Sequence, residues 1–422
     1  MTAITTVEQL GQVVRESVTR QTATDMHTHL YAPQYGKLLL RGIDELLTYH
    51  YLIAETMRWH ENGAAEFWKL GKREQADLVW RKLFIEHSPV SEACRGVLTT
   101  LKRFGLNPGS RDLESYRRVY AGIDPFRHTD MVLNLANVDH AVMTNDPFDD
   151  EERPFWLAGV TPDPRFHAAL RIDPLVNRYD AVAGRLREWG YDVGNEWSER
   201  TAGEVRRFLA DWLGRMKPLY MAVSLPDDFV YPDDTVRTRV IQDCILPLSR
   251  EANVPLAMMI GVRRQVNPAL RSGGDAVGKA DLESVSRLVA ANPANKFLVT
   301  ALARENQHEL VVLARKFGNL MIFGCWWFLN NPSLVSEMTK MRVEMLGTSF
   351  IPQHSDARVL DQLIYKWDHS RAVIADVLIE KYRGIFETGW RIDAAEIRRD
   401  VADLMRNNFW RFVNRPDMVR YD

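Results

Sequence analysis

Short apolar runs alternate with amphipathic segments over most of this 422-residue chain, and the alternation limits the folds it can adopt. The runs lie near 139–147, 166–174, 219–226, 254–262, 296–303, 319–328 and 345–356. Many are apolar on both faces and are separated by helical segments, which indicates parallel strands covered on both sides. With a further run before His27, the pattern predicts a (β/α)8 barrel. A doubly wound open sheet is the alternative, but no GxGxxG follows the first strand.

Two long helical stretches flank and interrupt this pattern. The segment 37–130, which contains "GIDELLTYHYLIAETMRW", has helical periodicity and few strand signals. We interpret it as an insertion after the first strand, where a barrel loop lies over the catalytic mouth. The segment 360–422 is predicted to be a C-terminal helical extension, and 5–22 an amphipathic N-terminal helix. No linker or repeat divides the chain, so we expect 1–422 to form one barrel domain.

The composition excludes several classes of partner. The chain is 46% apolar and 26% charged, which is typical of a globular protein, and its formal net charge is −2. A net charge this close to zero provides no excess of basic residues for binding nucleic acid or an anionic membrane. Its three cysteines form no CxxC, and no signal peptide or membrane span is evident. We therefore expect a cytoplasmic protein without nucleic-acid or membrane partners, and a homo-oligomer remains possible.

The stretch "TDMHTHL" places His27 and His29 two positions apart. Residues i and i+2 of a strand point to the same face, so both imidazoles can reach one ion. Asp356 ends the eighth run, and strands one and eight are neighbours in a closed barrel. Two imidazoles and one carboxylate make a three-ligand site with open positions, as in a catalytic divalent metal site such as that of zinc.

Each of these residues also has a simpler interpretation. The HxH could be a chance match on a loop, and Asp356 could only cap the following helix. His354 is expected to pack behind the site rather than to bind the ion. Strands four to six end without ligands, and His308 falls in a probable helix, so the sequence predicts one metal rather than two. Arg171 and Asp173, after the third strand, could be an ordinary ion pair.

The motifs resemble those of the uronate isomerases, a divergent branch of the amidohydrolase superfamily. "DMHTHL" is similar to the HxHL of that family, and "ELLTYHYLIAETMR" to its helix with a His-Tyr pair. "RIDP", "FGCWWF", "SDAR" and "NNFWRFV" resemble further family segments, in the same order along nearly the whole chain. The resemblance implies a distorted barrel of amidohydrolase type.

The resemblance also assigns roles to single residues. It implies that His27, His29 and Asp356 bind one divalent metal, with zinc as the expected ion. It places His50 and Tyr51 in the pocket as catalytic residues. It gives contacts with a uronate sugar to these residues: Arg171, Arg358, Trp326 (or Trp327), and Arg411 or Arg415. The chain departs from the family pattern at Met259, where a histidine is usual, and at "ARENQHE" after strand six.

An enzyme of this family converts an aldose uronate to a ketose uronate by moving a proton from C2 to C1 through a cis-enediol. It would act on glucuronate and on galacturonate. Asp356, with a metal-activated water, is the candidate base, Tyr51 the acid, and Arg358 or Arg171 the carboxylate clamp. From its apolar surroundings alone, Tyr51 would be a core aromatic. The alternatives are a mononuclear metal-dependent hydrolase acting on a lactone or amide, and an inactive barrel that serves as a scaffold.

Overall fold

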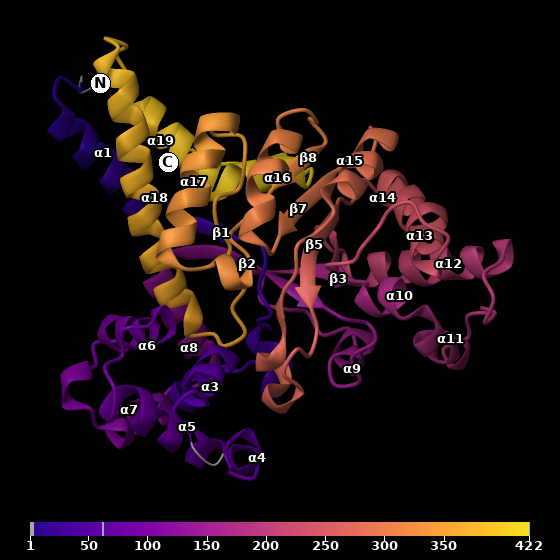
Figure 1. Cartoon of the computed structure of the whole chain (residues 1–422), viewed down its shortest axis with the longest axis horizontal. Helices are drawn as coiled ribbons and strands as arrows, with labels where there is room; N and C mark the ends of the chain where they lie inside the picture. The colour runs from indigo at the N-terminus through magenta and orange to yellow at the C-terminus, as the bar shows by residue number, and fades with distance from the viewer. Residues whose placement is uncertain (1–3, 61–62, 422) are drawn as a thin grey trace.

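A computed structural model describes residues 4–60 and 63–421 of the chain. Seven parallel strands form one curled sheet in the order β1-β2-β3-β4-β5-β7-β8 (Figure 1). Their bounds are Ala23–Asp25 (β1), Val138–Asn145 (β2), Phe166–Arg171 (β3), Met221–Pro226 (β4), Leu256–Arg263 (β5), Phe297–Ala301 (β7) and Leu320–Ile322 (β8). A two-residue strand, β6 (Ala276–Val277), pairs antiparallel with the end of β5. The predicted α/β barrel architecture is confirmed.

An irregular eighth segment closes the sheet between β8 and β1. On one side, the backbone N–H of Ile351 donates to the carbonyl of Ile322 at 3.0 Å. On the other, the N–H of Asp356 donates to His27 at 3.2 Å, and the N–H of His29 donates to Ala357 at 2.7 Å. Strand eight of the barrel is therefore present as an extended loop bonded to both neighbours.

The prediction of a regular strand over 345–356 is wrong in detail. Residues 345–346 end helix α17 (Pro332–Leu346), and Gly347 follows it with a φ of 62°. Only Ile351 forms a bridge to β8, and the next residue, Pro352, has no N–H for a ladder bond. Likewise, the run 319–328 is strand only over Leu320–Ile322, because it turns at Gly324 (φ 61°).

Helices surround the sheet and fill the connections between strands (Figure 1). The helices before β2 are α1 (Val7–Arg20), α2 (Ile43–Leu47), α3 (His50–Thr56), α4 (Gly63–Phe67), α5 (Lys72–Trp80), α6 (Glu92–Arg103), α7 (Leu113–Ala121) and α8 (Pro125–Ala136). Those between β2 and β5 are α9 (Arg153–Leu157), α10 (Asp173–Asn177), α11 (Tyr179–Glu188), α12 (Glu199–Met216), α13 (Val236–Arg239) and α14 (Leu246–Ala252). The remaining ones are α15 (Leu282–Ala291), α16 (Gln307–Ala314), α17, α18 (Gln362–Glu387), α19 (Ala394–Ala402) and α20 (Asn408–Phe412). No helix of the described residues is long and apolar enough to cross a membrane.

The helices α2 to α7 bury a hydrophobic cluster of their own. Its members include Leu46, Leu52, Val79, Leu101 and Tyr116. These helices lie together below the sheet, at the end toward which β5 points (Figure 1). The last helix before β2, α8, packs instead against β2 and α18 and so belongs to the barrel wall. Separate packing lets α3 reach the strand ends without being part of the barrel.

The opposite end of the barrel is closed by the C-terminal helices. Trp410 of α20 donates from its indole N–H to the Thr24 hydroxyl on β1 at 2.9 Å. The Lys296 ammonium, just before β7, donates to the carbonyl of Phe412 at 3.1 Å. The apolar barrel interior between the two ends includes Met26, Val142, Ala169, Met259 and Phe323.

Candidate metal centre and adjoining cavity

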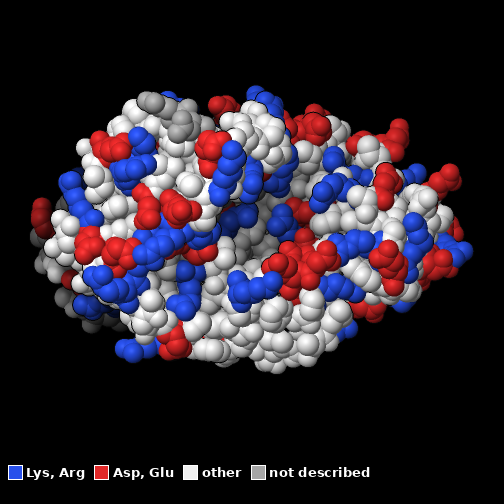
Figure 2. Space-filling view, turned by 90° about the horizontal axis from the view of Figure 1, so that it is seen from below, with Lys and Arg blue, Asp and Glu red and all other residues white. Residues whose placement is uncertain are grey.

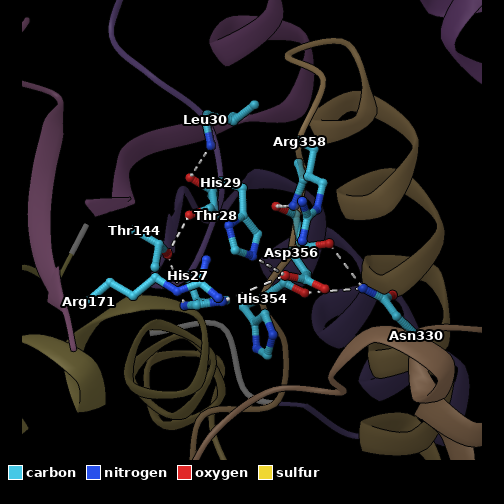
Figure 3. Close-up of polar contacts among 12 residues, drawn as sticks. His27, Thr28, His29, Leu30, Thr144, Arg171, Asn330, His354, Asp356 and Arg358 are labelled. Atoms are coloured by element: carbon cyan, nitrogen blue, oxygen red, sulfur yellow. Dashed lines mark hydrogen bonds and ion pairs between the residues drawn. The ribbon is translucent and has the colours of Figure 1, made fainter. Parts of the chain in front are cut away.

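The two histidines of "DMHTHL" and Asp356 meet at the C-terminal ends of the strands (Figure 3). The Asp356 Oδ1 lies 3.6 Å from His27 Nε2 and 3.3 Å from His29 Nε2. One ligand atom from each residue falls within 4.8 Å of the others, which is compact enough to hold a single ion. β1 ends before the histidines, but the bonds to Ala357 and Asp356 keep the backbone extended, so both rings face the same carboxylate.

Neighbouring hydroxyls fix which nitrogen of His27 carries hydrogen. The Tyr220 hydroxyl donates to the Met26 carbonyl at 2.6 Å, and the Thr144 hydroxyl donates to the Thr28 carbonyl at 2.7 Å. Both hydroxyl oxygens also lie near His27 Nδ1, at 3.3 and 3.5 Å. Since their own hydrogens are committed, they can only accept, so Nδ1 carries the hydrogen. The lone pair of Nε2 is therefore directed at Asp356, as a metal ligand requires.

The protonation state of the histidines also suits a cation. Burial lowers the pKa of His27 to about 3, and burial together with Arg358 and Arg171 lowers that of His29 well below its usual value. Both imidazoles are therefore neutral. His27 Nε2 and Asp356 Oδ1 are buried and have no hydrogen-bond partner among the described residues. Such atoms are costly to bury unsatisfied, and one divalent cation would satisfy them together.

Asp25 holds the eighth segment in place and was not identified from the sequence. Its Oδ1 accepts from the backbone N–H of Ser355 at 3.0 Å, and its Oδ2 accepts from the indole N–H of Trp367 at 2.9 Å. The carboxyl is fully buried, and burial raises its pKa to about 6. Through Ser355 it sets the position of Asp356, whose own φ is 52°. Its place two residues before His27 was the only signal in the sequence.

His354 lies behind the three candidate ligands. Its ring is 5.3 Å from that of His27, and neither of its nitrogens has a partner among the described residues. It does not belong to the group whose ligand atoms converge. Gly324 makes room for it, because a Cβ there would collide with the imidazole.

Helix α3 brings His50 and Tyr51 to the same end of the barrel. The His50 ring lies 4.6 Å from the Tyr51 ring and 5.8 Å from the Trp327 ring. His50 Nε2, the Tyr51 hydroxyl and Trp327 Nε1 are buried without partners among the described residues. Trp326 and Trp327 both belong to the barrel-interior cluster, and neither indole N–H donates a hydrogen bond to the described residues; that of Trp327 is the buried one.

Two arginines lie beside the centre in different states (Figure 3). The Arg358 guanidinium makes no hydrogen bond or ion pair with the described residues, and its charge lowers the pKa of His29 and His50. Arg171, at the end of β3, donates to Asp173 Oδ1 at 3.0 Å. The ion-pair interpretation of Arg171 is therefore correct, yet Asp173 Oδ2 is buried and unpaired.

A cavity of about 540 Å³ adjoins Arg171. Its lining comes from the C-terminal ends of β2 to β5 and the following loops and includes Asp146, Arg171, Asp173, Asn177, Ser224, Arg237 and Arg264. Figure 2 looks onto this end and shows a hollow near the middle of the face, with Lys and Arg side chains in and around it. Burial raises the pKa of Asp146 to about 6. Buried atoms of Asn177 and Arg237 are also unpaired, so the cavity offers both donors and acceptors to a ligand.

The structure separates Arg411 and Arg415 from this site, against the sequence-based expectation. Both follow the segment that closes the opposite end of the barrel, and both guanidinium groups are partly exposed. Arg411 pairs with Asp403 at 2.9 Å, and Arg415 pairs with Asp417 at 2.8 Å. The motif "NNFWRFV" therefore reflects packing of Trp410 against the barrel floor. Met259 lies in the barrel interior, and exposed His308 lies on α16, so neither adds a ligand.

Comparison with known proteins was made at three levels. No family model matches the chain, and no curated protein matches it. Among solved structures, a uronate isomerase from Bacillus halodurans is 60% identical, with a TM-score of 0.97 over 98% of both chains. A uronate isomerase from Thermotoga maritima is 16% identical, with a TM-score of 0.77 over 97% of both chains. A glucuronate isomerase from Caulobacter crescentus is 16% identical, with a TM-score of 0.76 over 98% of this chain and 96% of that one.

The two structures at 16% identity establish the fold, and the Bacillus halodurans structure also shows family membership. A likeness of 16% shows only that the barrel and its large connection after β1 are shared. Identity at 60% of positions over nearly the whole length of both proteins goes further. By that measure this chain belongs to the uronate isomerase family.

Proposed function

We propose that this protein interconverts the aldose and ketose forms of hexuronates. The pairs would be D-glucuronate with D-fructuronate and D-galacturonate with D-tagaturonate. The observation that carries the proposal is the 60% identity to the Bacillus halodurans uronate isomerase over 98% of both chains. A neutral imidazole pair, a free carboxylate oxygen and an unpaired guanidinium at one mouth support it, since proton transfer on an acidic sugar needs such groups.

The group that could hold a metal consists of His27, His29 and Asp356. Two imidazoles and one carboxylate favour zinc among the divalent ions, with positions left open for substrate. When bound, the metal would polarise the oxygens on C1 and C2 of the open-chain sugar.

Asp356 and Tyr51 are proposed as the catalytic acid–base pair. Asp356 would take the proton from C2 and return it to C1. The Tyr51 hydroxyl would give its proton to O1 as the enediol forms and recover one from O2 as the ketone forms. Every proton is returned, so the reaction is a net isomerisation. Asp356 Oδ1 faces the two histidines, while its Oδ2 makes no hydrogen bond with the described residues and is left to act as the base. The unpaired Tyr51 hydroxyl supports the role of the acid.

The remaining residues of the mouth would hold the sugar. Arg171 and Arg358 are proposed to bind the carboxylate and hydroxyls, because a planar guanidinium matches a carboxylate in geometry. His50 is proposed as a catalytic hydrogen-bonding residue, and Trp326 or Trp327 as the wall that donates to a sugar oxygen; the N–H of Trp327 is buried and unpaired among the described residues. Helices α2 to α7, within the segment 37–130, would cover the mouth and exclude water.

The test is conversion of glucuronate and galacturonate by the purified protein, with a ketose-specific readout, before and after treatment with chelator. We expect both uronates to be isomerised and the neutral aldoses glucose and galactose to remain unchanged. Hydrolysis of lactones without any isomerisation would replace the proposal by the hydrolase alternative. That alternative is supported here only by a metal-dependent hydrolase from Lactobacillus casei, 13% identical with a TM-score of 0.56, which shows the fold alone.

A further inference from the structure

Lys366 lies close to the proposed catalytic group and is largely buried. It is in the first turns of α18, and only 4% of its surface is exposed. Its ammonium makes no hydrogen bond or ion pair with the described residues. Holding an ammonium mostly out of water without a partner is costly, so such a residue calls for a reason in the folded state.

The side chains around Lys366 belong to the proposed catalytic group. Its Nζ lies 5.6 Å from the centroid of the Tyr51 ring and 6.0 Å from that of Tyr365. Its charge lowers the pKa of both His50 and His354, so these imidazoles are close enough to sense it. Lys366 thus lies among the groups of the mouth, and it does not line the cavity that Arg171 lines.

Three carboxylates lie near enough to influence Lys366, namely Asp356, Asp25 and Glu92. Both oxygens of Asp25 accept hydrogen bonds, from Ser355 and Trp367. Glu92 is bound by Arg95 at 2.7 Å and by His369 at 2.6 Å. Asp356 Oδ1 alone is buried and unpaired. Of the three carboxylates, Asp356 is therefore the one whose charge is not already satisfied by hydrogen bonds from the described residues.

We propose that Lys366 is a positioning residue for the isomerisation, which rests on the function proposed above. Its ammonium lies over the face of the Tyr51 ring, where a cation is attracted by the π electrons. It fixes the ring in place and supplies a permanent positive charge behind it. That charge stabilises the phenolate oxygen, which carries negative charge after Tyr51 has given its proton to O1. Lys366 itself neither binds the sugar nor exchanges a proton with it.

The first test compares Lys366→Met, which keeps most of the volume but removes the charge, with Lys366→Arg, which restores a charge. We expect Lys366→Met to lower kcat by about 10- to 100-fold with KM changed less than about 2-fold. Its thermal stability should be unchanged or higher, because a buried unpaired charge has been removed. Lys366→Arg should recover part of kcat. The control is Lys381→Met, at the other end of α18, where the lysine pairs with Glu344 on the surface and no loss is expected.

The second test asks whether Lys366 acts through Tyr51. In a Tyr51→Phe background, Lys366→Met should change kcat by less than about 3-fold, because the phenolate to be stabilised is absent. Metal content, measured by mass spectrometry, should be the same with and without the lysine. Unchanged kcat in Lys366→Met, an equal loss in Lys366→Arg, or a loss explained by missing metal would each overturn the proposal.

Failure of the proposed function is distinguishable from failure of this inference. If the unaltered protein isomerised no uronate, the function would be wrong. The contact itself would still be tested by chemical unfolding of Lys366→Met, Tyr51→Leu and the double variant. A coupling between the two substitutions is expected, and strict additivity would overturn the inference.

Discussion

Histidines gather at both ends of this barrel, but they are used in opposite ways. At the closed end, His167 Nε2 and His140 Nδ1 lie 3.0 Å apart and bond to each other. The Trp410 ring covers them at 5.2 and 5.4 Å. At the mouth, His27 Nε2 faces Asp356 without a hydrogen bond. The histidines of the closed end satisfy each other, whereas those of the mouth stay available for a ligand.

The charge state of the imidazoles does not distinguish the two ends. Burial lowers the pKa of His167 to about 4 and that of His27 to about 3, so both are neutral near pH 7. The carboxylates differ instead. Asp139, at the closed end, accepts from Arg406 at 2.7 Å, while Asp356 Oδ1 has no partner. Perturbed pKa values alone would therefore have suggested two sites, and the unpaired carboxylate oxygen selects one.

The largest effect is expected from Asp356→Ala. It removes the proposed base and one metal ligand, so activity should fall by about 10³-fold or more. Bound metal, measured by mass spectrometry, should fall well below one ion per chain. After chelation of both proteins, the thermal midpoint of the variant should not lie below that of the unaltered protein, since the variant lacks a buried charge that is unpaired without metal. If the variant kept both its metal and its turnover, Asp356 would be neither the base nor a metal ligand. The matched control at the closed end, Asp139→Asn, should keep both.

Tyr51→Phe comes next. Loss of the proposed acid should lower kcat by about 10²- to 10³-fold, because general acid catalysis contributes at that level. KM should change little, and the apolar surroundings of the ring should keep the fold intact. Steady-state kinetics on glucuronate provide the measurement. Full activity of the variant would mean that Tyr51 is a core aromatic and not the acid. Tyr116→Phe, within the cluster of α2 to α7, serves as the control for loss of a buried hydroxyl there.

Arg171→Lys should have a smaller effect, mainly on KM. A lysine keeps the charge but loses the planar fork, so KM for glucuronate should rise by about 10-fold, with kcat changed much less. The comparison variant is Arg165→Lys, at the opposite end of β3, where the arginine pairs with Asp163 on the protein itself. An equal change of KM in both variants would contradict a contact with substrate.

The closed end should show its role in stability rather than activity. Because the folded-state pKa of His167 is about 4, below the usual 6.5, the unfolded chain binds more protons between these values. The contribution of the His167–His140 pair to the unfolding free energy is therefore complete above about pH 6.5 and is lost as the pH falls toward 4. The unfolding free energy should drop by about 1–3 kcal/mol over that window.

His167→Gln tests whether this histidine causes the pH dependence of the unfolding free energy. Its chemical-denaturation profile between pH 4 and 7 should be flatter than that of the unaltered protein, since the other histidines remain in both. Activity at pH 7.5 should stay within about 2-fold, because the residue lies at the far end of the barrel from Asp356. An identical pH slope in both proteins would show that the histidine pair does not contribute.

The strand–helix alternation, the helical stretch after the first strand and the spacing of His27 and His29 could be predicted from the amino-acid sequence. These depend on local periodicity, so they can be read along the chain. The sequence also paired Asp356 with the histidines, because closure of a parallel barrel makes the first and last strands neighbours. The structure bears out that juxtaposition through direct backbone bonds.

Tertiary structure alone decided the rest, because it depends on which distant side chains share a space. Nothing local distinguishes Arg358, which is unpaired at the mouth, from Arg411, which is paired with Asp403 near the closed end. The same is true of Trp327 and Trp326, since only the indole N–H of Trp327 is both buried and without a partner among the described residues. Asp25 and Lys366 gain their importance from neighbours hundreds of residues away. Spacing along the chain cannot reveal burial without a partner, and that property defines this site.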